Sequence, residues 1–206
     1  MPEDVSYRQW RAKIEKHYPE SDVSPSKLVP RSLKDAKAVA DKLNPVVGKY
    51  FVRKSKWSGQ VTISTRGRNS KNPNCSIEIN PKDCPDEAIL HELIHAHSTS
   101  YYPNKIYIAN SAIEEASVQY LTQEIAKREG IILIGSGYDY WVEALREINS
   151  KFSLYETDLK FAQRLLRVPM EMRLDWLGGL IPFNGTIEQY QTLLSKLELI
   201  RQWTTS

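Results

Sequence analysis

The stretch that most constrains this chain lies near its middle, at residues 85–98. Pro85 suits the first turn of a helix, and the two acidic residues after it suit the positive end of the helix dipole. Mostly apolar residues follow, which predicts a buried helix. His91 and His95 are four residues apart, so their side chains lie on one face of that helix, one turn apart. Both imidazoles can therefore reach a single metal ion.

The same stretch forms the pattern H-E-x-x-H, which is typical of zinc sites on helices. Zinc binds imidazole nitrogens at about 2.0–2.1 Å and favours four ligands. Glu92 lies about 100° round the helix from His91, so it is not a ligand of the same kind. It can reach a water on the metal, whose pKa zinc lowers to about 7, and accept its proton. The alternative is a helix that carries two ordinary, partly buried histidines.

A third protein ligand is expected, with the fourth position left for water. The next predicted helix, over 111–129, offers Glu114 and Glu115. With Ser111 as the N-cap, Glu114 stands at the position that completes a capping box, which gives it a structural role. Glu115, 20 residues after His95, is then expected to face the first helix and bind the metal.

With this H-E-x-x-H helix and the glutamates of the next helix, the chain resembles the gluzincin zinc metallopeptidases, of the thermolysin and aminopeptidase types. The resemblance covers about residues 76–121, and 50–165 is more loosely similar to peptidase domains of phage and mobile-element proteins. It implies a zincin-like core, made of a small, mostly antiparallel sheet, an active-site helix and a glutamate helix. The metzincin pattern is absent, because Tyr101 stands in place of its third histidine. The exopeptidase signature of the aminopeptidases is absent too, so an endopeptidase is expected.

Further roles follow from the resemblance. The strand before the active-site helix, Ser76–Asn80, is expected to be an edge strand that pairs with an extended peptide substrate. A tyrosine is expected to stabilise the oxyanion, with Tyr138 as the first candidate and Tyr140, Tyr101 and Tyr102 as others. The alternative for each tyrosine is an aromatic residue that only packs in the core.

The rest of the sequence predicts an α+β fold with a helical C-terminal part. A hairpin is expected between Tyr50–Val52 and Val61–Ile63, across a turn at Trp57–Gly59, and a polar loop at 65–74. The expected segments are an N-terminal helical part at 1–45, a zincin-like catalytic core at 46–130 and a helical subdomain at 131–206, all of which can also form one domain. Other helices are expected at 3–18, from Ser32 to Asn44, and at 139–151, 155–167, 170–178 and 186–203.

Composition excludes some partners. The 206 residues carry a net charge of +3, too small to indicate nucleic acid binding, and no apolar run is long enough to span a membrane. No signal peptide is recognised, so a cytoplasmic protein is expected, with non-classical export as the alternative. Cys75 and Cys84 are expected to be free thiols rather than a short-loop disulfide. The expected partner is a protein or peptide substrate; a non-catalytic, zinc-stabilised interaction protein is the rival interpretation. The sequence does not indicate the oligomeric state.

Overall fold

The computed structural model describes residues 28–51, 54–65, 67–72, 74–98 and 104–180, together with Thr186, Glu188 and Gln191. These residues form helices and one small sheet, so the α+β class is confirmed. The expected helix over 3–18 and nearly all of the one over 186–203 lie outside the described residues. Within the described part of the chain, no helix combines the length and the apolar character needed to cross a membrane.

Helix α2, Leu33–Gly48, begins where the sequence predicts it. The backbone N–H of Asp35 donates to the hydroxyl oxygen of Ser32 at 3.1 Å, which caps the first turn. The expected end at Asn44 is wrong, because the helix continues through Pro45 to Gly48. One more turn places Val47 in the core, where it is fully buried, and this burial offsets the hydrogen bond that proline cannot donate.

The sheet has three short strands, β1 (Val61–Ile63), β2 (Ser70–Lys71) and β3 (Ile77–Ile79), in the order β1-β3-β2. Strand β1 pairs with β3 in parallel, and β2 pairs with β3 antiparallel. The partner of β1 is β3, and neither Tyr50 nor Phe51 is in a strand, so among the described residues the expected hairpin is wrong; Val52 lies outside them. The sheet is mixed rather than mostly antiparallel, and β2 forms within the expected loop 65–74.

Strand β3 is also not the edge strand that the resemblance implied, because it lies between β1 and β2. Its two isoleucines, Ile77 and Ile79, are fully buried. Strands buried in this way belong in the middle of a sheet, where both edges are paired. An added peptide strand therefore has no edge to join along β3.

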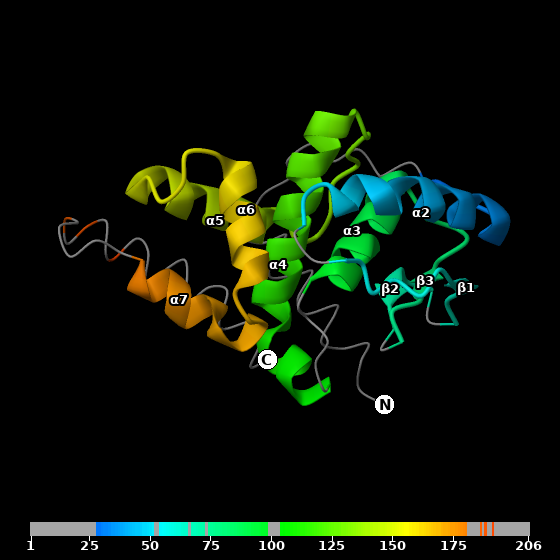
Figure 1. Cartoon of the computed structure of the whole chain (residues 1–206), viewed down its shortest axis with the longest axis horizontal. Helices are drawn as coiled ribbons and strands as arrows, with labels where there is room; N and C mark the ends of the chain where they lie inside the picture. Colours follow the sequence, from blue (N-terminus) through cyan, green and yellow to red (C-terminus); the bar gives the residue numbers. More distant parts are fainter. Residues whose placement is uncertain are drawn as a thin grey trace.

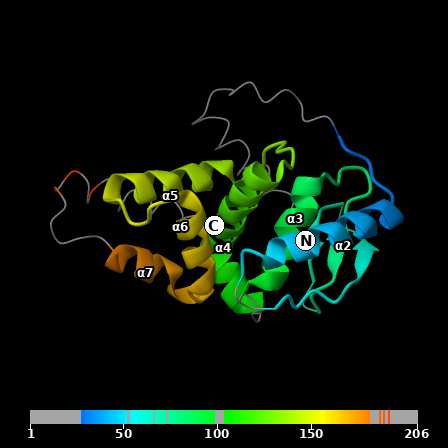
Figure 2. The ribbon, with the colours of Figure 1, turned by 45° about the horizontal axis from the view of Figure 1, so that its top comes forward.

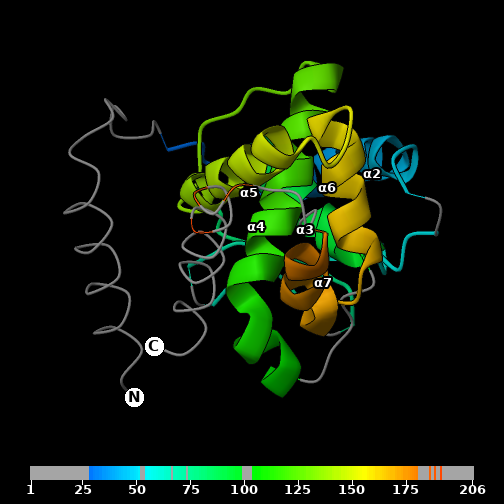
Figure 3. The same cartoon turned by 90° about the vertical axis from the view of Figure 1, so that its left-hand side faces the viewer.

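The helices divide into two groups on either side of α4, Asn104–Glu129 (Figure 1). Helix α2, the sheet and α3 (Asp86–His97) lie on one side. The other side holds α5 (Asp139–Phe152), α6 (Asp158–Arg167), the short 3-10 helix η1 (Met170–Met172) and α7 (Arg173–Gly179). The turned view in Figure 2 keeps the same two groups, and α3 packs between α2 and α4. Figure 3 shows α5, α6 and α7 in front of α4.

The C-terminal helices begin close to their expected positions. Helix α6 starts at Asp158 rather than 155, because the hydroxyl of Thr157 accepts the backbone N–H of Lys160 at 3.2 Å and caps it there. The helix expected over 170–178 is divided into η1 and α7. Helices α5 and α6 and the short η1 pack on α4, and α7 packs on η1, so these elements complete the core on the far side of α4.

Helix α3 is buried almost all round, as its sequence predicts. Its apolar side chains join the core together with those of α4 and α6; fully buried examples are Leu90, Leu93, Ile113, Leu121 and Phe161. A buried helix cannot leave polar side chains unpaired without a large free-energy cost. The histidines and glutamates of α3 must therefore find their partners inside the protein, and α4 supplies most of them.

Candidate metal centre

Three expected ligands meet between α3 and α4. The Nε2 atoms of His91 and His95 are 3.2 Å apart. The Oε2 atom of Glu115 lies 3.0 Å from Nε2 of His91 and 3.4 Å from Nε2 of His95. All three residues are buried, and their donor atoms are close enough to one another to hold a metal ion.

The spacing of these atoms suits a small tetrahedral ion. Two ligand atoms at 2.0–2.1 Å from one tetrahedral ion lie about 3.3–3.4 Å apart. The three distances between the donors of His91, His95 and Glu115 are 3.0, 3.2 and 3.4 Å. Two imidazole nitrogens and one carboxylate oxygen are also a donor set that zinc accepts. The residues present therefore fit such an ion.

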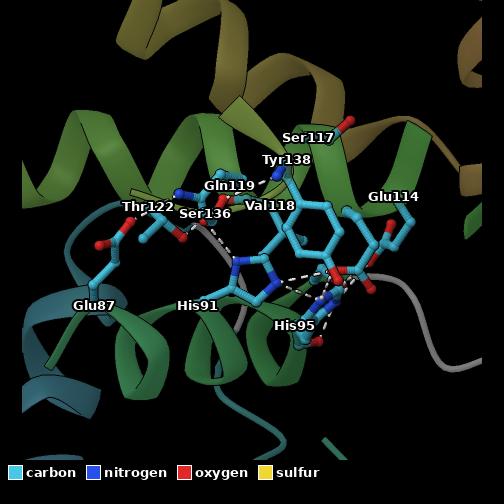
Figure 4. Close-up of polar contacts among 12 residues, drawn as sticks. Glu87, His91, His95, Glu114, Ser117, Val118, Gln119, Thr122, Ser136 and Tyr138 are labelled. Carbon is cyan, nitrogen blue, oxygen red and sulfur yellow. Dashed lines mark hydrogen bonds and ion pairs between the residues drawn. The ribbon is translucent and has the colours of Figure 1, made fainter. Parts of the chain in front are cut away.

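The outer nitrogen of each histidine is Nδ1, the ring nitrogen that faces away from the three donor atoms. In His91 this nitrogen is held by a hydrogen-bonded series of neutral and acidic groups (Figure 4). Nδ1 of His91 lies 2.9 Å from Oε1 of Gln119, and Nε2 of Gln119 donates to Glu87 at 2.8 Å. The other oxygen of Glu87 accepts the backbone N–H of Ile134 at 2.7 Å. Because the Glu87 carboxylate only accepts, the amide of Gln119 turns its oxygen to His91, whose Nδ1 then carries the proton. The Nε2 lone pair of His91 is left for a metal.

The outer nitrogen of His95 is held by a carboxylate. Its Nδ1 lies 3.0 Å from Oε1 of Glu114, and Oε2 of Glu114 forms an ion pair with Arg173. The carboxylate accepts, so Nδ1 of His95 donates, and in the neutral ring Nε2 also presents a lone pair. Two lone pairs 3.2 Å apart do not hydrogen-bond each other. A cation between His91 and His95 satisfies both.

The charges in the site call for the same cation. Burial opposes a charge on His95, but the carboxylates of Glu115 and Glu114 outweigh it and raise the pKa of His95 to about 10. Burial likewise opposes a charge on His91, and Glu115 outweighs it and raises the pKa of His91. Burial would raise the pKa of Glu115, but the two histidines hold it well below its usual value. The electrostatics of the site therefore favour a positive charge there, which a proton or a metal ion could supply.

The role expected for Glu114 is wrong, although Glu115 reaches the expected place. Helix α4 begins at Asn104, so Ser111 lies inside the helix and is not its N-cap. Glu114 is fully buried and supports His95 instead of a helix end. Glu114 and Glu115 are neighbours on the helix. The carboxylate of Glu115 faces Nε2 of both histidines, and that of Glu114 accepts from Nδ1 of His95.

Tyr107 is a residue of the site that the sequence did not predict. Its hydroxyl donates to Oε1 of Glu115, while Oε2 of Glu115 faces the two histidines. Burial and the Glu115 carboxylate raise the pKa of Tyr107, so the hydroxyl keeps its proton. With one oxygen engaged in this way, Glu115 presents only the other to an ion. Tyr107 is eight residues before Glu115, about two helical turns, and this spacing is the signal for it.

Tyr138 lies at the metal centre, as its ring stacks on that of His91 with centroids 5.7 Å apart (Figure 4). The charge of Glu115, burial and the charge of Glu92 hold the pKa of Tyr138 well above its usual value, so its hydroxyl remains a donor. Tyr140 also packs against the core. Tyr101 and Tyr102 lie outside the described residues.

Glu92 is buried one residue after His91, on α3. Burial raises its pKa, the two histidines oppose that shift, and the nearby Lys71 of β2 opposes it further. Within the described part of the chain, no hydrogen bond holds the Glu92 carboxylate. It is therefore in a position to take up and release a proton.

Other residues take different places. Asp139 accepts hydrogen bonds from Gln123 at 2.7 Å and from Gln119 at 3.3 Å, and Gln119 separates it from His91. His97 is buried away from the centre, with Nε2 3.0 Å from Oδ1 of Asn44. Cys75 and Cys84 are buried free thiols, and burial raises the pKa of Cys84 to about 11.

Comparisons with models of known families, with curated proteins and with solved structures give no match for this chain.

Proposed function

We propose that the chain is a zinc-dependent endopeptidase, in which His91, His95 and Glu115 hold the metal. One observation carries the proposal. Two histidines of an H-E-x-x-H helix and a glutamate of the next helix bring their inner atoms within 3.0–3.4 Å of one another, and both outer nitrogens are held by acceptors. That arrangement leaves three ligand atoms for one ion, as a catalytic zinc site needs.

A zinc ion held by His91, His95 and Glu115 would supply Lewis-acid chemistry, in which a carbonyl oxygen is polarised and the pKa of water is lowered to about 7. Oε2 of Glu115 faces the two histidines while Oε1 accepts from Tyr107, so Glu115 would offer one oxygen to the ion and the site would have three protein donors, as catalytic zinc sites do. Tyr107 supports this arrangement through its hydrogen bond to Oε1 of Glu115.

Glu92 is proposed as the general base. It removes a proton from the attacking water as the water oxygen bonds to the carbonyl carbon of the substrate. When the C–N bond breaks, Glu92 returns that proton to the leaving amine. Its raised pKa suits this exchange, because proton transfer is most efficient when the pKa of the base is near the working pH.

Tyr138 is proposed as the donor to the oxyanion that forms on the substrate. Its ring lies against His91, and its hydroxyl keeps its proton. Oriented donors of this kind contribute about 2.7–4 kcal/mol to transition-state stability in acyl transfer.

The peptide is proposed to lie along β2 rather than β3. Strand β2 is at the edge of the described sheet, and Lys71 in β2 is close enough to influence the pKa of Glu92. Backbone pairing with an edge strand is a common way to hold an extended peptide.

The test is Glu92→Gln, assayed on an unstructured protein substrate and for bound zinc. We expect turnover to fall by at least about 100-fold while zinc is retained, because only the base is removed. Glu171→Gln changes an exposed carboxylate of η1 and serves as the matched control. Full activity in Glu92→Gln would contradict the mechanism. A wild type that binds zinc but cleaves no substrate in a broad peptide screen would support the non-catalytic, zinc-stabilised interaction protein instead.

A further inference from the structure

A buried ion pair links α7 to the metal centre. Arg173 and Glu114 are both 0% exposed, and they are 59 residues apart in sequence. Nη1 of Arg173 pairs with Oε2 of Glu114, while Nε of Arg173 donates to the backbone oxygen of Val168 at 3.1 Å. Oε1 of Glu114 accepts from Nδ1 of His95 at 3.0 Å. The guanidinium, the carboxylate and the imidazole thus form one continuous chain.

Such a pair is not explained by stability alone. Removing two charges from water is costly, and apolar residues of similar volume often stabilise a fold as well as a buried ion pair does. What the pair adds is direction. Arg173 engages one oxygen of Glu114 and is itself tied to Val168, so the second oxygen of Glu114 is aimed at His95.

We propose that Arg173 is a positioning residue of the metal centre, which orients His95 through Glu114. The histidine in turn points its Nε2 at the ion, and outer hydrogen-bond partners of this kind set the orientation of metal-binding histidines. The inference rests on the metal site of the proposed function but not on peptide hydrolysis. Arg173, the first residue of α7, begins the hydrogen-bonded series that leads through Glu114 to His95. The inference therefore makes the segment after α6 part of the metal centre.

The test is a double-mutant cycle on zinc affinity, measured by competition with a chelating indicator. The variants are Arg173→Met, Glu114→Gln and the double variant. Arg173→Met is expected to weaken zinc binding by about 10-fold, the low end of the effect of losing a histidine's own outer partner, because Arg173 acts one step beyond that partner, Glu114. In the Glu114→Gln background the same change is expected to have little further effect, because Arg173 acts only through the carboxylate. Absorption spectra of the Co²⁺-loaded variants report whether the ligand geometry changes with the affinity.

Equal losses from Arg173→Met in both backgrounds, or no loss in either, would overturn the proposal. If Arg173→Met does not fold, the same cycle is run with Arg173→Lys, which keeps a positive charge. A loss with Arg173→Lys that disappears in the Glu114→Gln background supports the proposal, and equal losses or none contradict it. If the wild type binds no zinc, the metal site of the proposed function fails. If the wild type binds zinc but the cycle is additive, only this inference fails.

Discussion

His91 and His95 stand one turn apart on α3, but the protein supports them in different ways. The outer nitrogen of His91 meets an amide, Gln119, and the acidic end of that chain is one residue further away, at Glu87. The outer nitrogen of His95 meets a carboxylate directly, and a buried arginine compensates its charge. One histidine is thus held by polarity and the other by charge, so the two supports should respond differently to substitution.

The largest effect is expected at the charged support. Glu114→Leu leaves the guanidinium of Arg173 buried without its carboxylate, which should lower the free energy of unfolding by about 3–5 kcal/mol. Urea denaturation in the presence of a chelator measures this without a contribution from metal. The double variant Glu114→Leu/Arg173→Met should recover most of the loss, since no unpaired charge remains. A loss below about 1 kcal/mol in the single variant would mean that the pair is not important for folding.

The next effect is expected from pH in the metal-free protein. The folded pKa of His95 is raised to about 10 from 6.5, so the stability it contributes is complete below 6.5 and is lost as pH rises to about 10. The metal-free protein, kept in a chelator, should therefore unfold at a lower urea concentration at pH 10 than at pH 6.5. His95→Gln, which lacks the titrating group, should show a smaller decrease. Equal decreases in both proteins would indicate that the charge on His95 is not the cause.

At the neutral support the effect should be smaller. Gln119→Leu removes the acceptor of His91 and one of the donors to Glu87. The charge of Glu87 keeps a partner, because the backbone N–H of Ile134 still donates to it. The penalty should therefore be smaller than that of leaving Arg173 without its carboxylate. A loss of about 1–3 kcal/mol is expected from the buried groups left without a partner. The same denaturation experiment measures it. A loss larger than that of Glu114→Leu would reverse the comparison between the two supports.

The smallest effect is expected at Tyr107, which touches the ligand carboxylate rather than a histidine. Tyr107→Phe removes one hydrogen bond from a residue that is 39% exposed. Zinc binding should weaken by about 2- to 10-fold, the equivalent of one ordinary hydrogen bond. Tyr155→Phe, in which the changed ring stacks on Phe161 away from the site, is the control. No change in Tyr107→Phe would show that Glu115 needs no help to present a single oxygen.

The part of the site on α3 could be predicted from the sequence because it depends only on helical spacing. His91, Glu92 and His95 are placed by one helix, whatever packs around it. The place of Glu115 was also predicted, but from a cap at Ser111 that does not exist. Local capping signals do not show that a helix starts a further two turns upstream.

The supports were harder to predict for a different reason. Gln119 is four residues after Glu115, the same spacing that relates the two histidines, so it could have been found as a second contact of α4 with α3. Arg173 could not, because its pairing with Glu114 depends on the tertiary placement of η1 and the start of α7 beside α4. The prediction of the sheet failed for a similar reason. Strands of two or three residues have too short a hydrophobic pattern to indicate that β1 pairs in parallel with β3.

The most direct test of the metal centre is the zinc content of chelator-free protein, by elemental analysis, for wild type, Glu115→Ala and Glu114→Gln. We expect about one zinc ion per chain in the wild type, loss of that zinc in Glu115→Ala, and retained but weaker binding in Glu114→Gln. The two variants change neighbouring carboxylates of one helix, so the difference in zinc content between them shows which carboxylate binds the metal. A wild type that takes up no zinc even after titration, or an equal zinc content in Glu115→Ala, would contradict the three-ligand site.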